Sequence, residues 1–317
     1  MEAVPGPLDG VVVADFSRVL AGPYATMLLG DLGATVVKVE PPAGDETRRW
    51  GPPWAGDGTS TYYLGVNRNK YGVALDLATE AGRADAVALA SRADVLIENF
   101  RSGSLDRFGL GYAEVSARNP GLVYCSITGF GGESRLPGYD VVVQAASGLM
   151  SVTGDPDGEP SKVGVAIADV VTGLHAALAI VSALHGRQRT GRGQRVEVNL
   201  LSSMLSALVN ASSAYAETGE PPTRMGNRHP SICPYEPFPT ADKPLVIAAG
   251  NDAHFAALCT ELGIPELAGD PRFATNKDRV AHREEVTAAL AERLTARPAA
   301  YWAERLAAVG VPCGPVN

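Results

Sequence analysis

The runs Gly10-Val-Val-Val-Ala-Asp15 and Ala34-Thr-Val-Val-Lys-Val-Glu40 decide the fold of the first half of the chain. Both are short and rich in β-branched residues, which is typical of buried strands. Between them, residues 24–32 have a helical pattern that follows Gly22-Pro23. A strand, a helix and a second strand joined by short connections predict part of a parallel sheet.

The same alternation continues as far as residue 127. Residues 72–77, 94–98 and 122–127 have the composition of further strands, and residues 80–91 and 112–118 have helical patterns. The sequence therefore predicts an α/β fold whose mostly parallel sheet is covered on both faces.

After Tyr139 the pattern becomes mainly helical. We expect a large domain over residues 1–220 and a smaller α/β domain over residues 221–317, because residues 218–239 are rich in Pro and Gly and are typical of a linker. The other predicted elements are helices at 141–150, 170–185, 201–217, 253–262, 282–294 and 301–309, and strands at 194–200 and 245–249.

Composition excludes several classes of protein. The 317 residues include 45% hydrophobic and 20% charged residues, as in globular chains, and a formal net charge of −8 argues against a nucleic-acid partner. The most apolar stretch, residues 163–184, contains Asp169, Thr172 and His175, which favours a buried helix over a membrane span.

The cysteines and histidines do not form a recognisable site in the sequence. The four cysteines are scattered without a CxxC pair, and the five histidines have no metal-ligand spacing, so we expect reduced thiols and no metal. The first sixteen residues lack the basic start and apolar run of a signal peptide. These features favour a cytoplasmic protein with no membrane partner.

Candidate ligand-binding segments follow the predicted strands, because ligands of parallel sheets gather at the carboxyl ends of the strands. The segments are residues 16–22, 41–48, 99–107 and 128–139. Several cations near this edge would together suit an anion with several phosphates, although each alone is typical of a solvated surface. They are Arg18, Lys38, Arg48, Arg68, Lys70, Arg101 and Arg107.

The glycine-rich runs match no known phosphate-binding or nucleophile motif. Gly129-Phe-Gly-Gly132 and Gly191-Arg-Gly193 are neither a P-loop nor a GxGxxG fingerprint, and the chain has no GxSxG. We interpret both runs as turns.

Asp169 is an unusual carboxylate, since it is flanked by apolar residues and followed by a predicted helix. Burial there costs free energy unless the charge is stabilised. The free N–H groups at the start of the helix would keep it ionised, and a dry, charged carboxylate is a competent nucleophile. Alternatively, Asp169 is simply the N-cap of the helix.

The chain resembles the family III coenzyme A transferases, which include formyl-CoA and carnitine CoA-transferases and 2-methylacyl-CoA racemases. The resemblance extends over the whole chain in the order of its blocks. These blocks are Leu8-Asp-Gly-Val-Val-Val-Ala-Asp-Phe16, Leu20-Ala-Gly-Pro23, Gly30-Asp-Leu-Gly-Ala-Thr-Val-Val-Lys-Val-Glu-Pro-Pro42, Asn69-Lys70, Leu75-Asp-Leu77, Glu98-Asn-Phe-Arg-Ser-Gly103, Asp106-Arg107, Gly138-Tyr-Asp140, Ala168-Asp169, Thr190-Gly-Arg-Gly-Gln194 and Gly310-Val-Pro-Cys-Gly-Pro315.

The resemblance implies that Asp169 is the catalytic aspartate and forms covalent acyl and CoA intermediates. It also implies that Tyr139 lines the active site. The positions that match CoA contacts are Val19, Leu75, Asn99, Phe100 and Arg107. Coenzyme A enters as a thioester substrate, and no permanently bound cofactor is expected.

The chain departs from the family pattern at two basic positions, which are Pro41 and Pro137 here. By the resemblance, the phosphates of CoA would then be held by other cations, and Arg48, Arg68 and Arg101 are candidates. Racemases of the family carry histidine at the position of Tyr139. Because a tyrosine is a poor base at neutral pH, the sequence favours transfer over racemisation.

The acceptor side resembles the branch that uses succinyl-CoA and dicarboxylic acids. The resemblance rests on Met225-Gly-Asn-Arg-His-Pro-Ser-Ile-Cys-Pro-Tyr-Glu-Pro-Phe238 and Ala249-Gly-Asn251. A dicarboxylate needs a cation at its far end, and Arg228 or Arg224 would supply it.

The resemblance also implies an architecture: a Rossmann-like large domain and a smaller domain form a ring-shaped chain, and two rings interlock as a homodimer. Relatives continue back to the large domain, and we expect that return to be missing after Asn317. A racemase, or a CoA-binding homologue without activity, remains as the alternative.

Overall fold

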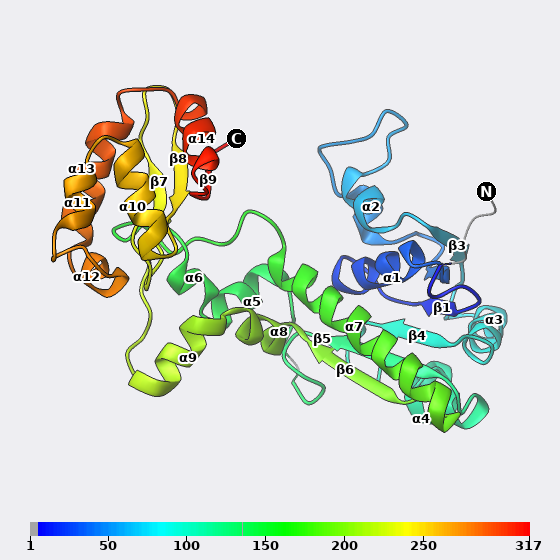
Figure 1. The fold of residues 1–317 in the computed structure, drawn as a ribbon. Coiled ribbons are helices and arrows are strands. Elements are labelled where there is room, and N and C mark those ends of the chain that lie inside the picture. The colour runs from blue at the N-terminus through cyan, green and yellow to red at the C-terminus, as the bar shows by residue number, and fades with distance from the viewer. Residues whose placement is uncertain (1–5, 135) are drawn as a thin grey trace. The chain divides into compact units, whose positions relative to one another are not determined.

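The computed structural model describes residues 6–134 and 136–317, which divide into two compact units (Figure 1). The first unit runs up to Met150 and resumes at Lys162–Pro222, and the second comprises Ser151–Ser161 and Thr223–Asn317. The prediction placed residues 151–161 in the large domain, whereas in the structure they are part of the second unit. They belong with the second unit because the Arg224 guanidinium donates to the Asp155 and Gly158 carbonyls.

The first unit contains a six-stranded sheet in the order β3-β2-β1-β4-β5-β6, and all its strands are parallel. This confirms the predicted α/β class. The strands are β1 (Val12–Asp15), β2 (Thr35–Glu40), β3 (Lys70–Ala74), β4 (Val95–Glu98), β5 (Val123–Thr128) and β6 (Arg195–Asn199).

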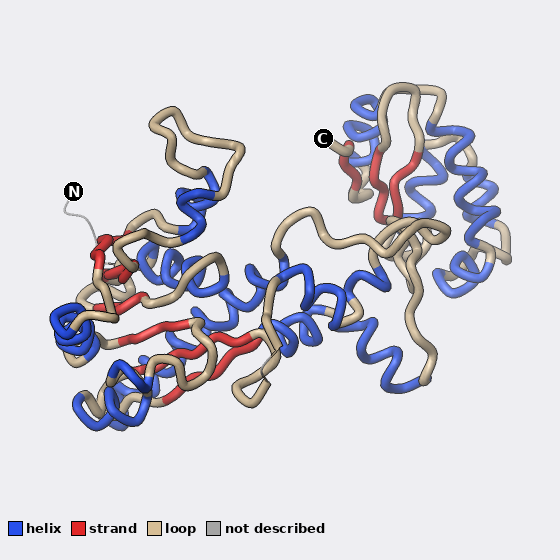
Figure 2. Tube along the Cα trace, turned by 180° about the vertical axis from the view of Figure 1, so that it is seen from behind, coloured by secondary structure: helices blue, strands red, loops and turns tan. Residues whose placement is uncertain are grey.

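Helices cover both faces of this sheet (Figure 2), because successive strand residues face opposite sides. Val13 belongs to the core under α1 (Ala21–Asp31) and α7 (Ile167–Thr190), whereas Ala14 belongs to the core under α3 (Glu80–Ala90). The α8 helix (Leu200–Ala207) joins the first face and α4 (Tyr112–Arg118) the second. The short helices are α2 (Thr61–Val66) and the 3-10 turns η1 (Glu46–Arg49) and η2 (Asp106–Phe108).

The strand order reverses between β1 and β4. From β1 the chain proceeds outward to β2 and β3, and it then returns to β4 on the other side of β1. The loops after β1 and β4 therefore leave in opposite directions and open a crevice at the carboxyl edge of the sheet, where such folds bind ligands.

Two predicted helices are each divided in two. The helix predicted over residues 141–150 is α5 (Asp140–Ala146) and α6 (Leu149–Val152), because Gly148 has a φ of 88° that no helix continues. The helix predicted over residues 201–217 is α8 and α9 (Val209–Thr218), and the chain turns at Val209, whose φ is 38°.

The second unit has its own three-stranded antiparallel sheet, β7 (Tyr235–Phe238), β8 (Leu245–Ala248) and β9 (Cys313–Pro315). The prediction of a linker over residues 218–239 was therefore wrong at its C-terminal end, where the chain forms β7. Pro237 hid the β7 strand from the sequence pattern, since proline is tolerated only on edge strands. The helices are α10 (Asp252–Glu261), α11 (Pro265–Gly269), α12 (Asn276–Ala281), α13 (Arg283–Leu294) and α14 (Ala299–Ala308).

Candidate active site

A cavity of about 790 Å³ opens at the carboxyl edge of the six-stranded sheet. All of its wall residues belong to the first unit. They come from the end of β5, from the loops after β1, β4 and β5 and from the starts of α1, α5, α7 and α8, with Glu46 of η1 after β2. The predicted residues Val19, Asn99, Phe100, Tyr139 and Asp169 lie together in this wall. The segments that the sequence places at the strand ends thus meet in one site.

Asp169 lies in the first turn of α7, as its third residue. The N-cap position is Ala166, which has no side-chain oxygen, so the interpretation of Asp169 as an N-cap was wrong. The cap comes from another element instead. The Asp140 Oδ1 atom at the start of α5 accepts from the backbone N–H groups of Ala168 (2.8 Å) and Asp169 (3.3 Å).

Gln144 holds the capping carboxylate in place. Its side-chain amide, one turn further along α5, donates to Asp140 Oδ2 at 2.6 Å and accepts from the backbone N–H of Val163 at 2.9 Å. Gln144 is fully buried. Asp140 therefore occupies the donors at the start of α7 that were expected to stabilise Asp169.

Asp169 consequently has a raised pKa. Its half-buried carboxyl loses hydration on burial, and the negative charge of Asp140 adds repulsion, so the pKa of Asp169 rises to about 7. The helix start does not offset the cost of burial as expected, because the N–H groups of Ala168 and Asp169 donate to another carboxylate. Near neutral pH the side chain exchanges between the acid and the nucleophilic carboxylate.

Two glycines allow the loop after β5 to reach this site. A Cβ on Gly129 would overlap the Cα of Gly138, and a Cβ on Gly138 would overlap that of Gly129. The close backbone approach closes the loop and carries Tyr139 and Asp140 back to the end of β5. The glycine-rich run at residues 129–132 is thus a turn, as predicted, and it also lines the cavity.

Two predicted CoA contacts lie outside the cavity wall. Leu75 follows β3 and packs against the core under α3 and α4, and the Arg107 guanidinium lies 4.6 Å from the centre of the Phe108 ring. In contrast, the Asn99 side chain both accepts from the Arg18 N–H (2.9 Å) and donates to the Arg18 carbonyl (2.7 Å). Asn99 thereby ties the loops after β4 and β1 to one another.

Apart from Arg107, which stacks on Phe108, the predicted phosphate-binding cations fall into two groups. Most are already paired: Lys38 with Asp45, Arg48 with Glu40, Arg68 with Asp31 and Lys70 with Asp15. Lys38 and Lys70 are also buried, which removes them from any ligand. The second group is Arg18 and Arg101, which line the cavity, and no carboxylate within residues 6–134 and 136–317 forms an ion pair with either.

Tyr139 and Arg228 have different surroundings. Tyr139 is the N-cap residue of α5, and 59% of it is exposed at the cavity wall. Arg228 belongs to the second unit, where its guanidinium pairs with Glu236 (3.1 Å) and Glu284 (2.6 Å).

Sequence reasoning missed the part played by two residues of this site. Residue 166, just before α7, is an alanine and cannot cap the helix with its side chain. The free N–H groups of α7 therefore require an acceptor from another element, and this requirement would have pointed to Asp140. Tyr62 on α2 lies close enough to Asp169 and Asp140 that, after burial, these two charges raise the pKa of its hydroxyl further. No sequence signal connects α2 to α7.

Across the part of the chain that the structure describes, no group of three metal-ligating side chains gathers.

The fold is that of a doubly wound α/β protein, and its cavity lies at the switch point of the sheet, where proteins of this class bind their ligands. The chain belongs to the CoA-transferase family III, whose family model matches residues 8–317. It is an enzyme, and its reaction is the transfer of coenzyme A.

Similar proteins extend this result. The chain is 46% identical to a succinate–glutarate CoA-transferase of Agrobacterium fabrum and 45% identical to an acetyl-CoA:oxalate CoA-transferase of Acetobacter aceti. It covers 80% and 81% of these relatives with 98% of its own length. The crystal structure of a CAIB/BAIF family protein from Brucella suis matches 99% of the chain and 85% of that protein, with 47% identity and a TM-score of 0.88.

Proposed function

We propose that this enzyme moves CoA from an acyl-CoA thioester, with succinyl-CoA as the donor, to a dicarboxylic acid through covalent intermediates on Asp169. The observation that carries the proposal is the half-buried Asp169 carboxylate in the wall of a cavity large enough for a thioester arm. The names of two relatives support the substrate class, since one acts on succinate and glutarate and the other on oxalate.

The reaction proceeds by four exchanges of an acyl group. The Asp169 carboxylate attacks the donor thioester carbon, the C–S bond breaks, and CoA thiolate leaves behind a mixed anhydride. The thiolate then attacks the aspartyl carbon and expels the donor acid as a carboxylate. The acceptor carboxylate attacks this aspartyl-CoA thioester, and the released thiolate finally takes the acceptor acyl group and frees Asp169.

The raised pKa of Asp169 suits this sequence of steps. The ionised carboxylate attacks, and its high basicity makes it a stronger nucleophile than an ordinary aspartate. The anhydride must be protected from water, and the apolar neighbours of Asp169 in α7 provide a dry side to the site.

The proposed CoA site consists of Val19, Asn99 and Phe100 with the cations Arg18 and Arg101. Arg18 lies 4.8 Å from the centre of the Phe100 ring, so one guanidinium and one aromatic face are already stacked beside the cavity. Leu75 and Arg107 remain proposed contacts from the family resemblance. No permanently bound cofactor is part of this proposal.

From the family resemblance, Tyr139 and Arg228 are the proposed contacts of the acceptor, each within its own unit. Tyr139, like Asp169, lines the cavity of the first unit. Arg228 would bind the distal carboxylate of the acceptor, and its partner Glu284, which is 77% exposed, is the one that a substrate carboxylate would replace. Glu236 would remain as the buried anchor of the guanidinium.

We also propose that two chains form an interlocked homodimer and that the enzyme is cytoplasmic. The helices α5, α7, α8 and α9 present apolar side chains to solvent, and exposed apolar patches mark interaction surfaces. These side chains are Val141, Val142, Leu174, Leu178, Leu205, Val209 and Tyr215. The free thiols of Cys125, Cys233, Cys259 and Cys313 suit a reducing compartment.

The test is CoA exchange between succinyl-CoA and a panel of glutarate, oxalate and acetate, followed by mass spectrometry. We expect the dicarboxylates to be converted, acetate to be a poor acceptor, and hydroxylamine to trap an aspartyl hydroxamate at Asp169. Asp169→Ala should lose exchange by about a thousandfold or more while still binding CoA. Equal turnover in that variant would refute the covalent role.

The racemase alternative has a separate readout. It predicts incorporation of solvent deuterium at the α-carbon of a 2-methylacyl-CoA. We expect no incorporation, because the position of the second base is occupied by Tyr139.

A further inference from the structure

Four charged side chains lie buried beneath the cavity wall and take no part in the proposed chemistry. Asp15, Lys38, Asp45 and Lys70 are each at most 2% exposed, and they form the ion pairs Lys38–Asp45 and Lys70–Asp15. They join the ends of β1 and β2 to the start of β3. Their bonds converge on the loop between β1 and α1.

This network holds Ser17 by all of its polar groups. The Ser17 N–H and hydroxyl both donate to Asp15 Oδ1, at 3.0 and 2.5 Å. The Lys38 ammonium donates to the Ser17 carbonyl at 3.0 Å and to Asp45 Oδ2 at 3.1 Å. The Lys70 ammonium, which donates to Asp15 Oδ2 and to the Pro23 carbonyl, fixes the beginning of α1.

The residues that directly follow Ser17 form the cavity wall. Arg18, Val19, Leu20 and Ala21 all line it. Val19 has a φ of 68°, a left-handed conformation that is strained for a β-branched side chain and persists only where its surroundings impose it. The Asn99 side chain bonds both backbone groups of Arg18, directly before Val19. Ser17 in turn is bonded to Asp15 at the end of β1.

Stability alone does not account for buried charges in this place. A buried ion pair is often replaced by apolar side chains of similar volume without loss of stability, because desolvation offsets the attraction of the charges. Apolar side chains, however, would give the Ser17 carbonyl no donor. The charge-assisted bond from Lys38 fixes the direction of that carbonyl and therefore the path of the next residues.

We propose that Lys38 is a positioning residue for the acyl-CoA substrate: through the Ser17 carbonyl it holds the β1–α1 loop, with its strained Val19, in the shape that receives the thioester. The inference deepens the proposed function and rests on it. Because a preformed wall contributes equally to the binding of substrate and transition state, it lowers KM and leaves kcat unchanged.

The test compares Lys38→Met with the double variant Lys38→Met/Asp45→Asn. The single variant leaves Asp45 buried without its cation, and we expect it to be less stable. The double variant removes both charges and keeps a side-chain amide oxygen that accepts from Thr47, so its thermal stability should recover. In both variants the KM for succinyl-CoA should rise about tenfold with kcat changed less than about twofold.

The matched control is Arg187→Met. Arg187 also bridges one carboxylate, Asp94, and one carbonyl, that of Gly121, but it does so at the opposite edge of the sheet. It follows Asp169 by eighteen residues on α7, a distance of about 27 Å along the helix. We expect lower stability and an unchanged KM in this variant.

CoA affinity, measured by calorimetry on the same proteins, separates the two proposals. An inactive wild type would refute the proposed function, and CoA binding would still test Lys38. A KM and a CoA affinity that stay at wild-type values in both Lys38 variants, with only thermal stability reduced, would overturn the positioning role. A KM that recovers together with stability in the double variant would overturn it as well.

Discussion

Two carboxylates, those of Asp169 and Asp140, lie at the start of α7, and Asp140 accepts the hydrogen bonds there. The backbone N–H groups of Ala168 and Asp169, at the beginning of α7, both donate to Asp140. The capping oxygen is an anion, so it stabilises the helix and destabilises a second charge beside it. Burial of the Asp169 carboxyl is the larger cause of its raised pKa, and the charge of the capping Asp140 adds to it.

The first prediction concerns the pH dependence of activity. Since the pKa of Asp169 is raised to about 7 and the carboxylate is the attacking form, kcat/KM should rise as the pH increases through about 7. Asp140→Asn keeps an oxygen for the two N–H groups and removes the charge. The acid limb of kcat/KM should therefore move to lower pH, by about one unit.

A pH profile of kcat/KM from about 5 to about 9, which covers the acid limb on both sides of its midpoint, checks the prediction. Asp157→Asn, an exposed change in the second unit, serves as the control and should leave the limb in place. A limb that stays near pH 7 in Asp140→Asn would show that burial alone raises the pKa of Asp169.

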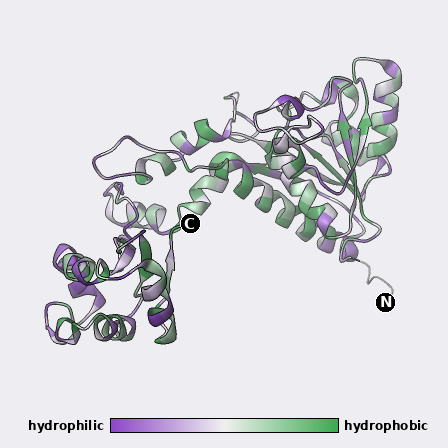
Figure 3. Ribbon diagram, turned by 90° about the horizontal axis from the view of Figure 1, so that it is seen from above, coloured by the Kyte–Doolittle hydropathy of each residue, from purple (hydrophilic) through white to green (hydrophobic). Residues whose placement is uncertain are grey.

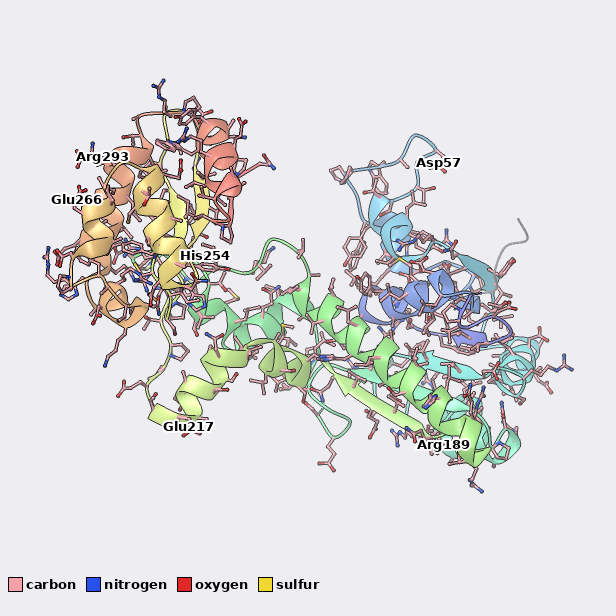
Figure 4. The ribbon with its side chains drawn as sticks, viewed as in Figure 1. Asp57, Arg189, Glu217, His254, Glu266 and Arg293 are labelled. Carbon is pink, nitrogen blue, oxygen red and sulfur yellow. The ribbon has the colours of Figure 1, made fainter. Side chains whose placement is uncertain are left out.

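At the scale of elements, α7 connects the chemistry to the core. One side of it packs on α1 and the sheet, and the long helix is coloured as hydrophobic over much of its length (Figure 3). By length and composition α7 would also be able to cross a membrane, but Ala176, Ile180 and Leu184 are part of the domain core. Arg189, labelled in Figure 4, marks its last turn, far from Asp169.

The second prediction tests the packing of α7 on α1. A Cβ at Gly173 would lie 2.7 Å from the Ala21 carbonyl oxygen, so Gly173→Ala must push the two helices apart. We expect a loss of about 1–3 kcal/mol in the free energy of unfolding and a higher KM, because Ala21 lines the cavity.

Gly186 on the same helix supplies the control, since apart from its chain neighbours and the adjacent backbone of its own helix no atom lies within 4 Å of its hypothetical Cβ. Gly186→Ala should raise the free energy of unfolding by up to about 1 kcal/mol, through helix propensity alone. Urea denaturation of the two variants measures both effects. If the two substitutions changed stability in the same direction, close packing at Gly173 would be disproved.

At the scale of the whole molecule, association depends on surfaces that one chain leaves uncovered. Leu178 on α7 is 66% exposed, and other exposed apolar side chains lie on α5, α8 and α9. A second copy of the chain would bury them. The loop from Trp50 to Ser60, with Asp57 at its tip in Figure 4, also exposes Trp54.

The third prediction is that the wild-type chain is a dimer and that Leu178→Asp weakens it. Light scattering during size-exclusion chromatography should give the mass of two chains for the wild type and a concentration-dependent mass for the variant. Leu64→Asp, an equally simple change at an exposed leucine of α2, should leave the mass unchanged. A monomeric wild type would contradict the proposed dimer.

Local patterns in the sequence predicted most of the first unit. The β-branched runs are strands, and the helix predicted over residues 112–118 has the bounds of α4, because strong local propensity and burial agree there. The helix break at Gly148 has a signal in the sequence, the Ser147-Gly148 pair, which the prediction missed. The break at Val209 was not predictable, since that position carries neither proline nor a turn motif.

The amino-acid sequence by itself determined the α/β class, the carboxyl-edge loops and the family, because these follow from periodicity and from blocks of residues in a set order. Only the tertiary structure decided the pKa of Asp169 and which carboxylates pair with the cations. Asp140 comes to α7 from a different helix, and Lys38 reaches Ser17 from a neighbouring strand. Charges interact through space and across burial, so their effect depends on distances that the order of residues does not contain.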